Sequence, residues 1–353
     1  MSAPGLMVVG VGGMARDHLI AILKAGALDP TTLPSRVVFV DIAPASLKKG
    51  LALFATAGLE APRTFASLDA ALAAGDLGVE VALIATPHNL HHAHAVACLR
   101  AGLDVWLEKP MVTTVAEATD LIRVRDETGR LLIVSFNGSL SPQVRRAVEL
   151  IQAGEIGTVT AIHGSAWQGW KADQTGTWRT DPVQSGGGFM FDTGAHLLNT
   201  ACDLAGADFE VVSAWLDNSG REVDILGAII ARTTTGAMVT LAGCGDTIDT
   251  CASDMKVFGT EGLIVTGMWG ERLLLQRQGE DEPTEVDVVT PIARWETVLA
   301  VRDGLLPNPS PAELGLRMSR LWDMIKASAA SGGVPVESRV VDSQMLVGMA
   351  DRR

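Results

Sequence analysis

The first 135 residues alternate short, nearly continuous apolar runs with amphipathic stretches of helix length. Such runs are typical of parallel strands that are buried on both faces and joined by right-handed crossover helices. This part of the chain therefore predicts a doubly wound α/β domain over residues 1–135. The predicted strands are Leu6–Gly10, Val37–Asp41, a weak Arg63–Phe65, Val79–Thr86, Val105–Glu108 and Leu131–Ser135.

From residue 136 onward the apolar runs are separated by turn signals such as Asn218-Ser219-Gly220. This pattern predicts an antiparallel or mixed sheet in a second, α+β domain over residues 136–353. Two longer helices are predicted there, over Phe189–Leu204 and Pro311–Ala330. The predicted strands are Thr158–His163, Glu210–Trp215, Asp224–Arg232, Met238–Ala242, Met255–Phe258, Arg272–Gln276, Glu285–Val289 and Val334–Glu337.

Composition narrows the class of protein. A chain of 353 residues with 47% hydrophobic side chains can form two packed cores. The formal net charge of −13 and the lack of a Lys/Arg block argue against a nucleic-acid partner. The sequence has no recognisable targeting signal or membrane-spanning run, and its four cysteines lack the CxxC spacing of a zinc site. We therefore expect a cytoplasmic protein that binds neither nucleic acid nor a membrane.

A glycine-rich motif follows the first predicted strand, Gly10-Val11-Gly12-Gly13-Met14-Ala15. In a GxGxxA loop the first glycine makes the tight turn, the second lets the backbone approach a pyrophosphate, and the small last residue permits close helix packing. The amide groups at the start of the following helix then bind the anion. The motif predicts a Rossmann dinucleotide-binding domain; an ordinary glycine-rich turn is the alternative.

Asp41 ends the second predicted strand, where a carboxylate can accept hydrogen bonds from ribose hydroxyls and repel a 2′-phosphate. This position favours NAD over NADP, although Lys48 and Lys49 follow on the next helix. We explain its long spacing from the glycine motif by a loop insertion over Gly26–Pro34. The alternative role for Asp41 is helix capping.

Histidines crowd the loop and helix after the fourth predicted strand. The segment reads Ala85-Thr86-Pro87-His88-Asn89-Leu90-His91, followed by His92 and His94. Their spacing could place pairs on one helix face as metal ligands, but no carboxylate or thiol joins them. We therefore predict no metal site and interpret the segment as a cofactor-facing loop.

Two further motifs carry candidate chemistry. Glu108-Lys109-Pro110 ends the fifth predicted strand, so Lys109 points into the cofactor crevice or, alternatively, into solvent. The predicted helix over Phe189–Leu204 has its polar residues on one stripe, which is either a solvent-exposed face or a set of functional residues. The stripe consists of Asp192, His196, Asn199 and Asp203.

These motifs, in this order along most of the chain, resemble the Gfo/Idh/MocA oxidoreductase family, which includes glucose-fructose oxidoreductase and inositol dehydrogenases. The matching segments are residues 10–15, Ala85-Thr86-Pro87 with His91, Glu108-Lys109-Pro110, Trp178-Arg179, Gly186-Gly187-Gly188 and Asp192 with His196. The resemblance implies a large, open substrate-domain sheet, and a lysine, Lys109, that contacts nicotinamide and substrate, often beside a cis proline. It also implies that Asp192 and His196 complete the catalytic group. The segment Phe136–Leu140 departs from many relatives, and the chain has no Tyr.

We therefore expect an NAD-dependent dehydrogenase that acts on a secondary alcohol of a sugar or cyclic polyol. His196 is the expected base, Asp192 its partner and Lys109 the donor to the substrate oxygen. Trp167, Trp178 and Arg179 are expected to bind substrate, while core packing or dimer contacts are the alternative for each tryptophan. The rival functions are an NAD-retaining glycosidase-like enzyme and a cofactor-sensing regulator. A sheet covered on one face also predicts a homodimer or homotetramer.

Overall fold

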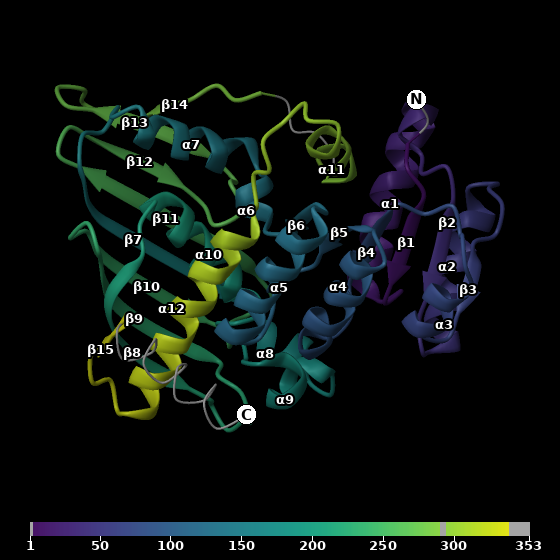
Figure 1. Ribbon diagram of the computed structural model, residues 1–353. Helices are drawn as coiled ribbons and strands as arrows, with labels where there is room; N and C mark the ends of the chain where they lie inside the picture. Colours follow the sequence, from purple (N-terminus) through teal and green to yellow (C-terminus); the bar gives the residue numbers. More distant parts are fainter. Residues whose placement is uncertain (1–2, 290–293, 339–353) are drawn as a thin grey trace. The chain divides into compact units, whose positions relative to one another are not determined.

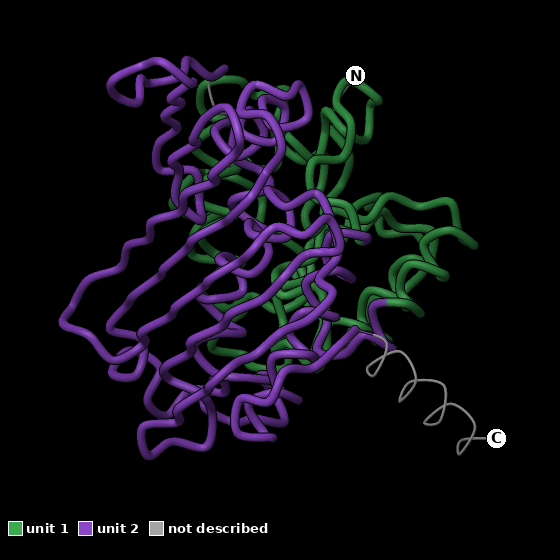
Figure 2. Tube along the Cα trace, turned by 90° about the vertical axis from the view of Figure 1, so that its left-hand side faces the viewer, with its two compact units in different colours: residues 1–111, 119–135, 292–312 green, residues 112–118, 136–291, 313–353 purple. Residues whose placement is uncertain are grey.

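The computed structural model describes residues 3–289 and 294–338, which belong to two compact units. Unit 1 comprises residues 1–111, 119–135 and 292–312, and unit 2 comprises residues 112–118, 136–291 and 313–353 (Figure 2). One crossing between the units lies at residues 135/136, where the sequence predicted a single domain boundary. The structure adds a return of the chain to unit 1 at residues 292–312.

Unit 1 contains a six-stranded sheet in the order β3-β2-β1-β4-β5-β6, in which every neighbouring pair is parallel (Figure 1). The order reverses between β1 and β4, so the carboxyl ends of these two strands form the switch point at which doubly wound sheets bind ligands. The predicted Rossmann-type sheet is thus confirmed. Its strands are β1 (Leu6–Val9), β2 (Val37–Val40), β3 (Arg63–Phe65), β4 (Val81–Ile84), β5 (Asp104–Leu107) and β6 (Leu132–Val134).

Helices connect these strands as the sequence pattern predicted, with one difference in the first crossover. Helix α1 continues through Gly26, because the side chain of Leu33 packs directly against this glycine, 2.2 Å from where a Cβ would lie. The predicted loop insertion over Gly26–Pro34 therefore begins only after Leu28. The helices are α1 (Gly13–Leu28), η1 (Pro30–Thr32), α2 (Pro44–Thr56), α3 (Leu68–Ala73), η2 (His88–Leu90), α4 (His91–Arg100) and α5 (Val115–Thr128).

The returning segment is fixed to unit 1 by α11 (Arg294–Arg302). The Trp295 ring stacks on Trp106 of β5 at a centroid distance of 6.2 Å, and its indole N–H donates to the Thr32 carbonyl over 2.7 Å. Arg302 forms an ion pair with Asp104 at 3.1 Å. These contacts join residues that are far apart in the chain, by 198 positions for Arg302 and Asp104 and by 263 for Trp295 and Thr32, so no local pattern could have predicted them.

Unit 2 contains a nine-stranded sheet in the order β14-β13-β12-β11-β7-β10-β9-β8-β15 (Figure 1). The β7–β10 pair is parallel and the other pairs that the register defines are antiparallel, which confirms the predicted mostly antiparallel sheet. The predicted last long strand, Glu285–Val289, is reduced to a two-residue strand. The strands are β7 (Val159–Gln168), β8 (Phe209–Asp217), β9 (Leu226–Thr233), β10 (Met238–Cys244), β11 (Cys251–Gly259), β12 (Gly262–Thr266), β13 (Leu273–Arg277), β14 (Thr284–Glu285) and β15 (Val336–Glu337).

One face of this sheet is covered by helices of unit 2 and the other is open. Along β9, buried and exposed residues alternate strictly, as expected for a sheet with one core face. Figure 2 shows the strands of unit 2 with their open face toward the viewer. The helices of unit 2 are α6 (Asn137–Leu140), α7 (Pro142–Gln152), α8 (Trp170–Asp173), η3 (Trp178–Thr180), α9 (Pro182–Ser185), α10 (Gly194–Ala205) and α12 (Ala312–Ala330). Among the described residues, no helix has both the length and the apolar character needed to cross a membrane.

Candidate active site

The glycine motif lies at the carboxyl end of β1, as predicted. Gly10 has a φ of +84°, and a Cβ there would lie 2.7 Å from the carbonyl oxygen of Ala85, so this position requires glycine. Gly12 and Gly13 instead face open space, and no side chain caps the start of α1 at Gly12. The loop therefore presents an uncapped helix N-terminus with an accessible backbone, which fits the pyrophosphate of a dinucleotide. Ala15 packs in the core, and Met14 is half-buried beside it.

Asp41 directly follows β2 and is bonded to this loop. Its carboxylate accepts the Val11 N–H through Oδ2 and the Ala43 N–H through Oδ1, both over 2.7 Å. A carboxylate offers about four acceptor sites, so these two bonds orient Asp41 without exhausting it. This arrangement fits a residue that accepts ribose hydroxyls beside the glycine loop. Arg16 also stabilises the loop by donating to the Val11 carbonyl over 2.8 Å, a contact that the sequence did not indicate.

His91 lies in the core of unit 1 rather than on the surface of the cofactor loop. Its Nδ1 lies 2.8 Å from the Pro110 carbonyl oxygen and its Nε2 lies 3.0 Å from the Thr86 carbonyl oxygen. Burial lowers the pKa of His91, although these two hydrogen bonds oppose the shift. The imidazole therefore links the Ala85-Thr86-Pro87 turn to the end of the Glu108-Lys109-Pro110 segment and positions both.

The other histidines of this cluster have separate neighbours. His92 pairs with Asp120 at 2.8 Å, and His94 lies 3.2 Å from the Thr86 hydroxyl. The His88 ring contacts the His91 ring at a centroid distance of 5.6 Å. Within residues 3–289 and 294–338, no group of three or more His, Cys, Asp or Glu residues is arranged to hold a metal ion.

Glu108 and Lys109 follow β5, and a cis peptide bond joins Lys109 to Pro110. Glu108 is buried, with one carboxylate oxygen 2.6 Å from His18 Nε2 and the other accepting the Lys109 N–H over 3.2 Å. Burial raises the pKa of Glu108, but the hydrogen bond from His18 and the nearby positive charges outweigh it, and the pKa falls to about 2. Glu108 is thus an internal anion that fixes the backbone at Lys109. Its partner His18, on α1, was missed because a single histidine on an apolar helix face gives no signal.

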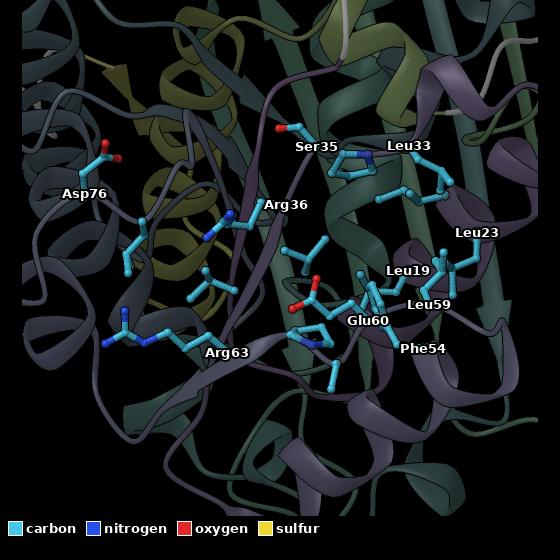
Figure 3. A pocket seen from close by; sticks show the side chains of 17 residues that line it. Leu19, Leu23, Leu33, Ser35, Arg36, Phe54, Leu59, Glu60, Arg63 and Asp76 are labelled. Atoms are coloured by element: carbon cyan, nitrogen blue, oxygen red, sulfur yellow. The ribbon is translucent and has the colours of Figure 1, made fainter.

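A cavity of about 440 Å³ lies at the end of the unit 1 strands that is opposite to the glycine loop (Figure 3). Arg36 precedes β2 and Arg63 begins β3, so this cavity faces the amino ends of the strands, whereas the glycine loop follows a carboxyl end. Its wall includes Leu19, Phe54 and Leu59. None of the predicted cofactor residues lines it.

The sequence predicted that Asp192 lies within a helix over Phe189–Leu204. In the structure, Asp192 instead lies in the turn before α10 of unit 2. Helix α10 begins at Gly194, whose N–H donates to the Phe189 carbonyl over 2.7 Å. The Asp192 Oδ2 atom accepts the Trp170 indole N–H over 2.8 Å and lies 3.0 Å from the Arg179 Nε. Trp170 and Arg179 therefore hold this carboxylate in a fixed orientation.

Three of the four stripe residues are buried and Asp203 is only partly exposed, so the interpretation of the stripe as a solvated helix face is wrong. Asp192, His196 and Asn199 have exposed fractions of 5%, 6% and 0%. The Asn199 amide donates to Ser139 over 2.8 Å, and Ser139 donates to Asp203 over the same distance. Asp203 also forms an ion pair with Arg145. Ser139 belongs to the segment Phe136–Leu140, so this segment stabilises α10 through the Ser139 side chain.

Aromatic rings surround His196. Its ring lies edge-on to Phe136 at a centroid distance of 6.3 Å and to Trp269 at 5.8 Å. Trp178 lies under the Arg179 guanidinium, 4.5 Å from the ring centroid. Trp167 differs, because the alternation along β7 puts it on the same open face as His163 and Ser165, whereas Gly164 faces Leu197 of α10. The sequence had proposed Trp167 as a substrate residue and did not indicate Trp269.

Two family models match the chain. Residues 5–136 match the oxidoreductase family with an NAD-binding Rossmann fold, and residues 144–265 match the Gfo/Idh/MocA C-terminal domain. These ranges contain the glycine motif and Lys109 in the first match and Asp192 with His196 in the second.

Several curated relatives are dehydrogenases. The chain is 32% identical to levoglucosan dehydrogenase of Pseudarthrobacter phenanthrenivorans over 40% of this chain and 36% of the relative. It is 29% identical to a 1-carboxy-3-chloro-3,4-dihydroxycyclohexa-1,5-diene dehydrogenase of Comamonas testosteroni over 60% of this chain and 50% of the relative. The matched part of the chain thus spans half or less of the length of these relatives.

Solved structures with the same fold cover nearly the whole chain. Levoglucosan dehydrogenase in complex with NADH has a TM-score of 0.80 and 22% identity, with coverage of 96% of this chain and 99% of that one. The aldose-aldose oxidoreductase of Caulobacter crescentus has a TM-score of 0.78 and 20% identity, with coverage of 95% and 99%.

Proposed function

Because the chain belongs to the Gfo/Idh/MocA family of NAD-binding oxidoreductases, we propose that it interconverts a secondary alcohol and a ketone on a sugar or cyclic polyol. The observation that carries this proposal is that Asp192 and His196 are both buried. Trp170 and Arg179 fix the Asp192 carboxylate, and the His196 imidazole lies between two aromatic rings. A purely structural turn and helix start would not require a buried carboxylate and a buried imidazole four residues apart. The names of the curated relatives support the substrate class.

The cofactor supplies hydride chemistry when bound, and Gly10, Gly12, Gly13 and Asp41 are the residues that would hold it. His196 takes the hydroxyl proton, because imidazole is the side chain with an ordinary pKa close to neutrality. Asp192 stabilises the resulting positive charge and keeps the local geometry. Lys109 donates a hydrogen bond to the substrate oxygen and stabilises developing negative charge on it.

We also propose that the cofactor is NAD rather than NADP. Asp41 is held beside the glycine loop by two backbone N–H groups, so a 2′-phosphate placed next to its charge would be repelled. Calorimetric titration with both dinucleotides tests this proposal. NADP binding as tight as NAD binding would contradict it.

Substitution kinetics test the catalytic roles. A panel of aldoses, inositols and sugar acids is first screened for NAD reduction. His196→Ala is then expected to lose roughly 10²- to 10⁴-fold in kcat while NAD affinity stays nearly constant. Asp192→Asn should add little to that loss in a double variant, because the two residues act as one group. Lys109→Met should also lower kcat, and it should weaken NAD binding.

His92→Ala is the matched control, since His92 pairs with Asp120 on α5 and has no assigned role. An almost normal His196→Ala enzyme, or losses from Asp192→Asn and His196→Ala that are fully additive, would contradict the proposed mechanism. A wild-type protein that reduces NAD with no compound of the panel would contradict the proposed function.

The open face of the unit 2 sheet supports a further part of this proposal, assembly into a homodimer or homotetramer. Ile230 and Met238 are 49% and 47% exposed on this face, and a shallow hollow of about 530 Å³ lies between β7, β9, β10 and β11. An exposed sheet face with large apolar residues is stabilised when another surface covers it.

A further inference from the structure

Trp269 is the aromatic residue beside His196 that no sequence motif indicated. It lies in the turn between β12 and β13, and its side chain is half-buried, whereas His196 is almost fully buried. The two ring centroids are 5.8 Å apart at an interplanar angle of 65°. The exposed part of this indole is therefore an apolar surface next to the imidazole.

The turn that carries Trp269 is anchored to the helix that carries His196. The Thr200 hydroxyl, one helical turn after His196, donates to the Met268 carbonyl over 2.8 Å. On the other side, the Met268 N–H donates to Ser253 over 2.8 Å and the Trp269 N–H donates to Glu271 over 3.0 Å. These bonds hold the backbone of Met268 and Trp269 in place beside α10, so the indole extends from a fixed main chain.

The other tryptophans near this region have different surroundings. Trp170 is fully buried and its N–H donates to Asp192, so its role is to orient that carboxylate. Trp178 is stacked against the Arg179 guanidinium. Trp167 lies on the open face of the sheet, away from α10. Trp269 is thus the indole whose partly exposed surface adjoins His196.

We propose that Trp269 is a specificity-determining residue, whose indole contacts the apolar C–H face of a ring-shaped polyol or sugar while a ring hydroxyl reacts at His196. The inference rests on the proposed function, since it takes His196 as the reacting group. A cyclic polyol has a flat face of C–H groups that an indole can cover, whereas an acyclic polyol has no fixed apolar face. Contact with this face stabilises the bound ring and selects it over the open chain.

The test compares cyclic and acyclic substrates in Trp269→Ala and Trp269→Phe. For a cyclic substrate from the panel, Trp269→Ala is expected to raise KM by roughly 10- to 100-fold, because it removes one large apolar contact. KM for NAD should stay unchanged, and Trp269→Phe should recover most of the loss. For an acyclic polyol of equal carbon number, the change in KM should be several-fold smaller.

Leu305→Ala serves as the control for removal of a large apolar side chain, because Leu305 is 75% exposed in unit 1 and belongs neither to the proposed site nor to the open sheet face. Circular dichroism and thermal unfolding check that each variant is folded; if Trp269→Ala is not, Trp269→Phe and Trp269→Leu give the same comparison. Equal losses for cyclic and acyclic substrates, or an unchanged KM for the cyclic one, would overturn the inference while His196→Ala still tests the proposed function separately. A His196→Ala enzyme of normal activity would remove the premise, and the inference with it.

Discussion

Glu108 and Lys109 are adjacent in the chain, yet their side chains have separate tasks. The Glu108 carboxylate is turned into the core, where His18 of α1 meets it at 2.6 Å, and the His18 ring in turn contacts Trp106 edge-on at 4.5 Å. An ionised carboxylate is stable in such a place only when it is paired and hydrogen-bonded. This hydrogen bond therefore connects the helix that follows the glycine loop to the backbone of Lys109.

This pair predicts a specific pH dependence of stability. The pKa of Glu108 falls from an ordinary value of 4.5 to about 2, so the unfolded chain binds a proton in this range that the folded protein does not. The stabilisation is complete above pH 4.5 and is lost as the pH falls through about 2. The free energy of unfolding is measured by urea denaturation at several pH values between 5 and 3. It should fall with pH more steeply in the wild type than in Glu108→Gln, by up to about 1.4 kcal/mol per pH unit.

Glu60→Gln, at an exposed position before β3, is the control for this measurement and should leave the slope unchanged. Parallel curves for the wild type and Glu108→Gln would show that the buried pair does not govern acid stability.

At the scale of elements, the turn before α10 explains how a flexible glycine run can present a fixed Asp192. Asp224, which precedes β9, accepts the Gly188 N–H over 2.7 Å and the Met190 N–H over 2.8 Å, and its own carbonyl accepts the Phe189 N–H over 2.7 Å. A Cβ at Gly188 would lie 1.9 Å from that carbonyl oxygen, so glycine is required for this approach. The Gly188 carbonyl then accepts the Asp192 N–H over 2.9 Å. Burial raises the pKa of Asp224, and the two amide bonds oppose this shift.

Asp224→Asn replaces one acceptor oxygen by an NH₂ group that faces a backbone N–H. We expect a loss of about 1–3 kcal/mol in the free energy of unfolding, since a buried donor is left unsatisfied. If the turn acts through Asp192, kcat should also fall, and this fall should disappear in an Asp192→Asn background. Chemical denaturation and steady-state kinetics of the single and double variants measure both effects.

The matched control is Asp217→Asn, where an exposed aspartate at the end of β8 bonds with Ser219. A variant at Asp224 that behaves like this control in both measurements would contradict the assigned role of the turn.

For the whole molecule, the open sheet face of unit 2 predicts assembly. Light scattering at micromolar concentration is expected to give a dimer or tetramer, and Ile230→Glu should shift it toward the monomer by placing a charge on the covered face. Val183→Glu introduces the same charge at a 77% exposed position on α9, away from the sheet, and should leave the assembly unchanged. A wild-type protein that is monomeric under these conditions would contradict the proposed interface.

The sequence by itself determined the features that depend on local pattern. Buried parallel strands have a continuous apolar signature, and strands with one covered face alternate, so both sheets could be predicted. The glycine motif could be identified because its residues satisfy backbone constraints within one turn, as the positive φ of Gly10 illustrates. The positions of Asp41 and Lys109 at strand ends could be predicted because both residues follow an apolar run of the sequence.

The tertiary structure alone decided which distant residues meet. Asp192 lies outside α10 because Asp224 holds residues 188–190, and helix periodicity contains no information about such a contact. His18 meets Glu108 across ninety positions, and Trp269 reaches His196 from a hairpin that carries no motif. Hydrogen bonds and ring contacts of this kind depend on how helices and strands pack against one another. The sequence pattern predicts whether a segment forms a helix or a strand, but it does not predict which distant segment packs against it.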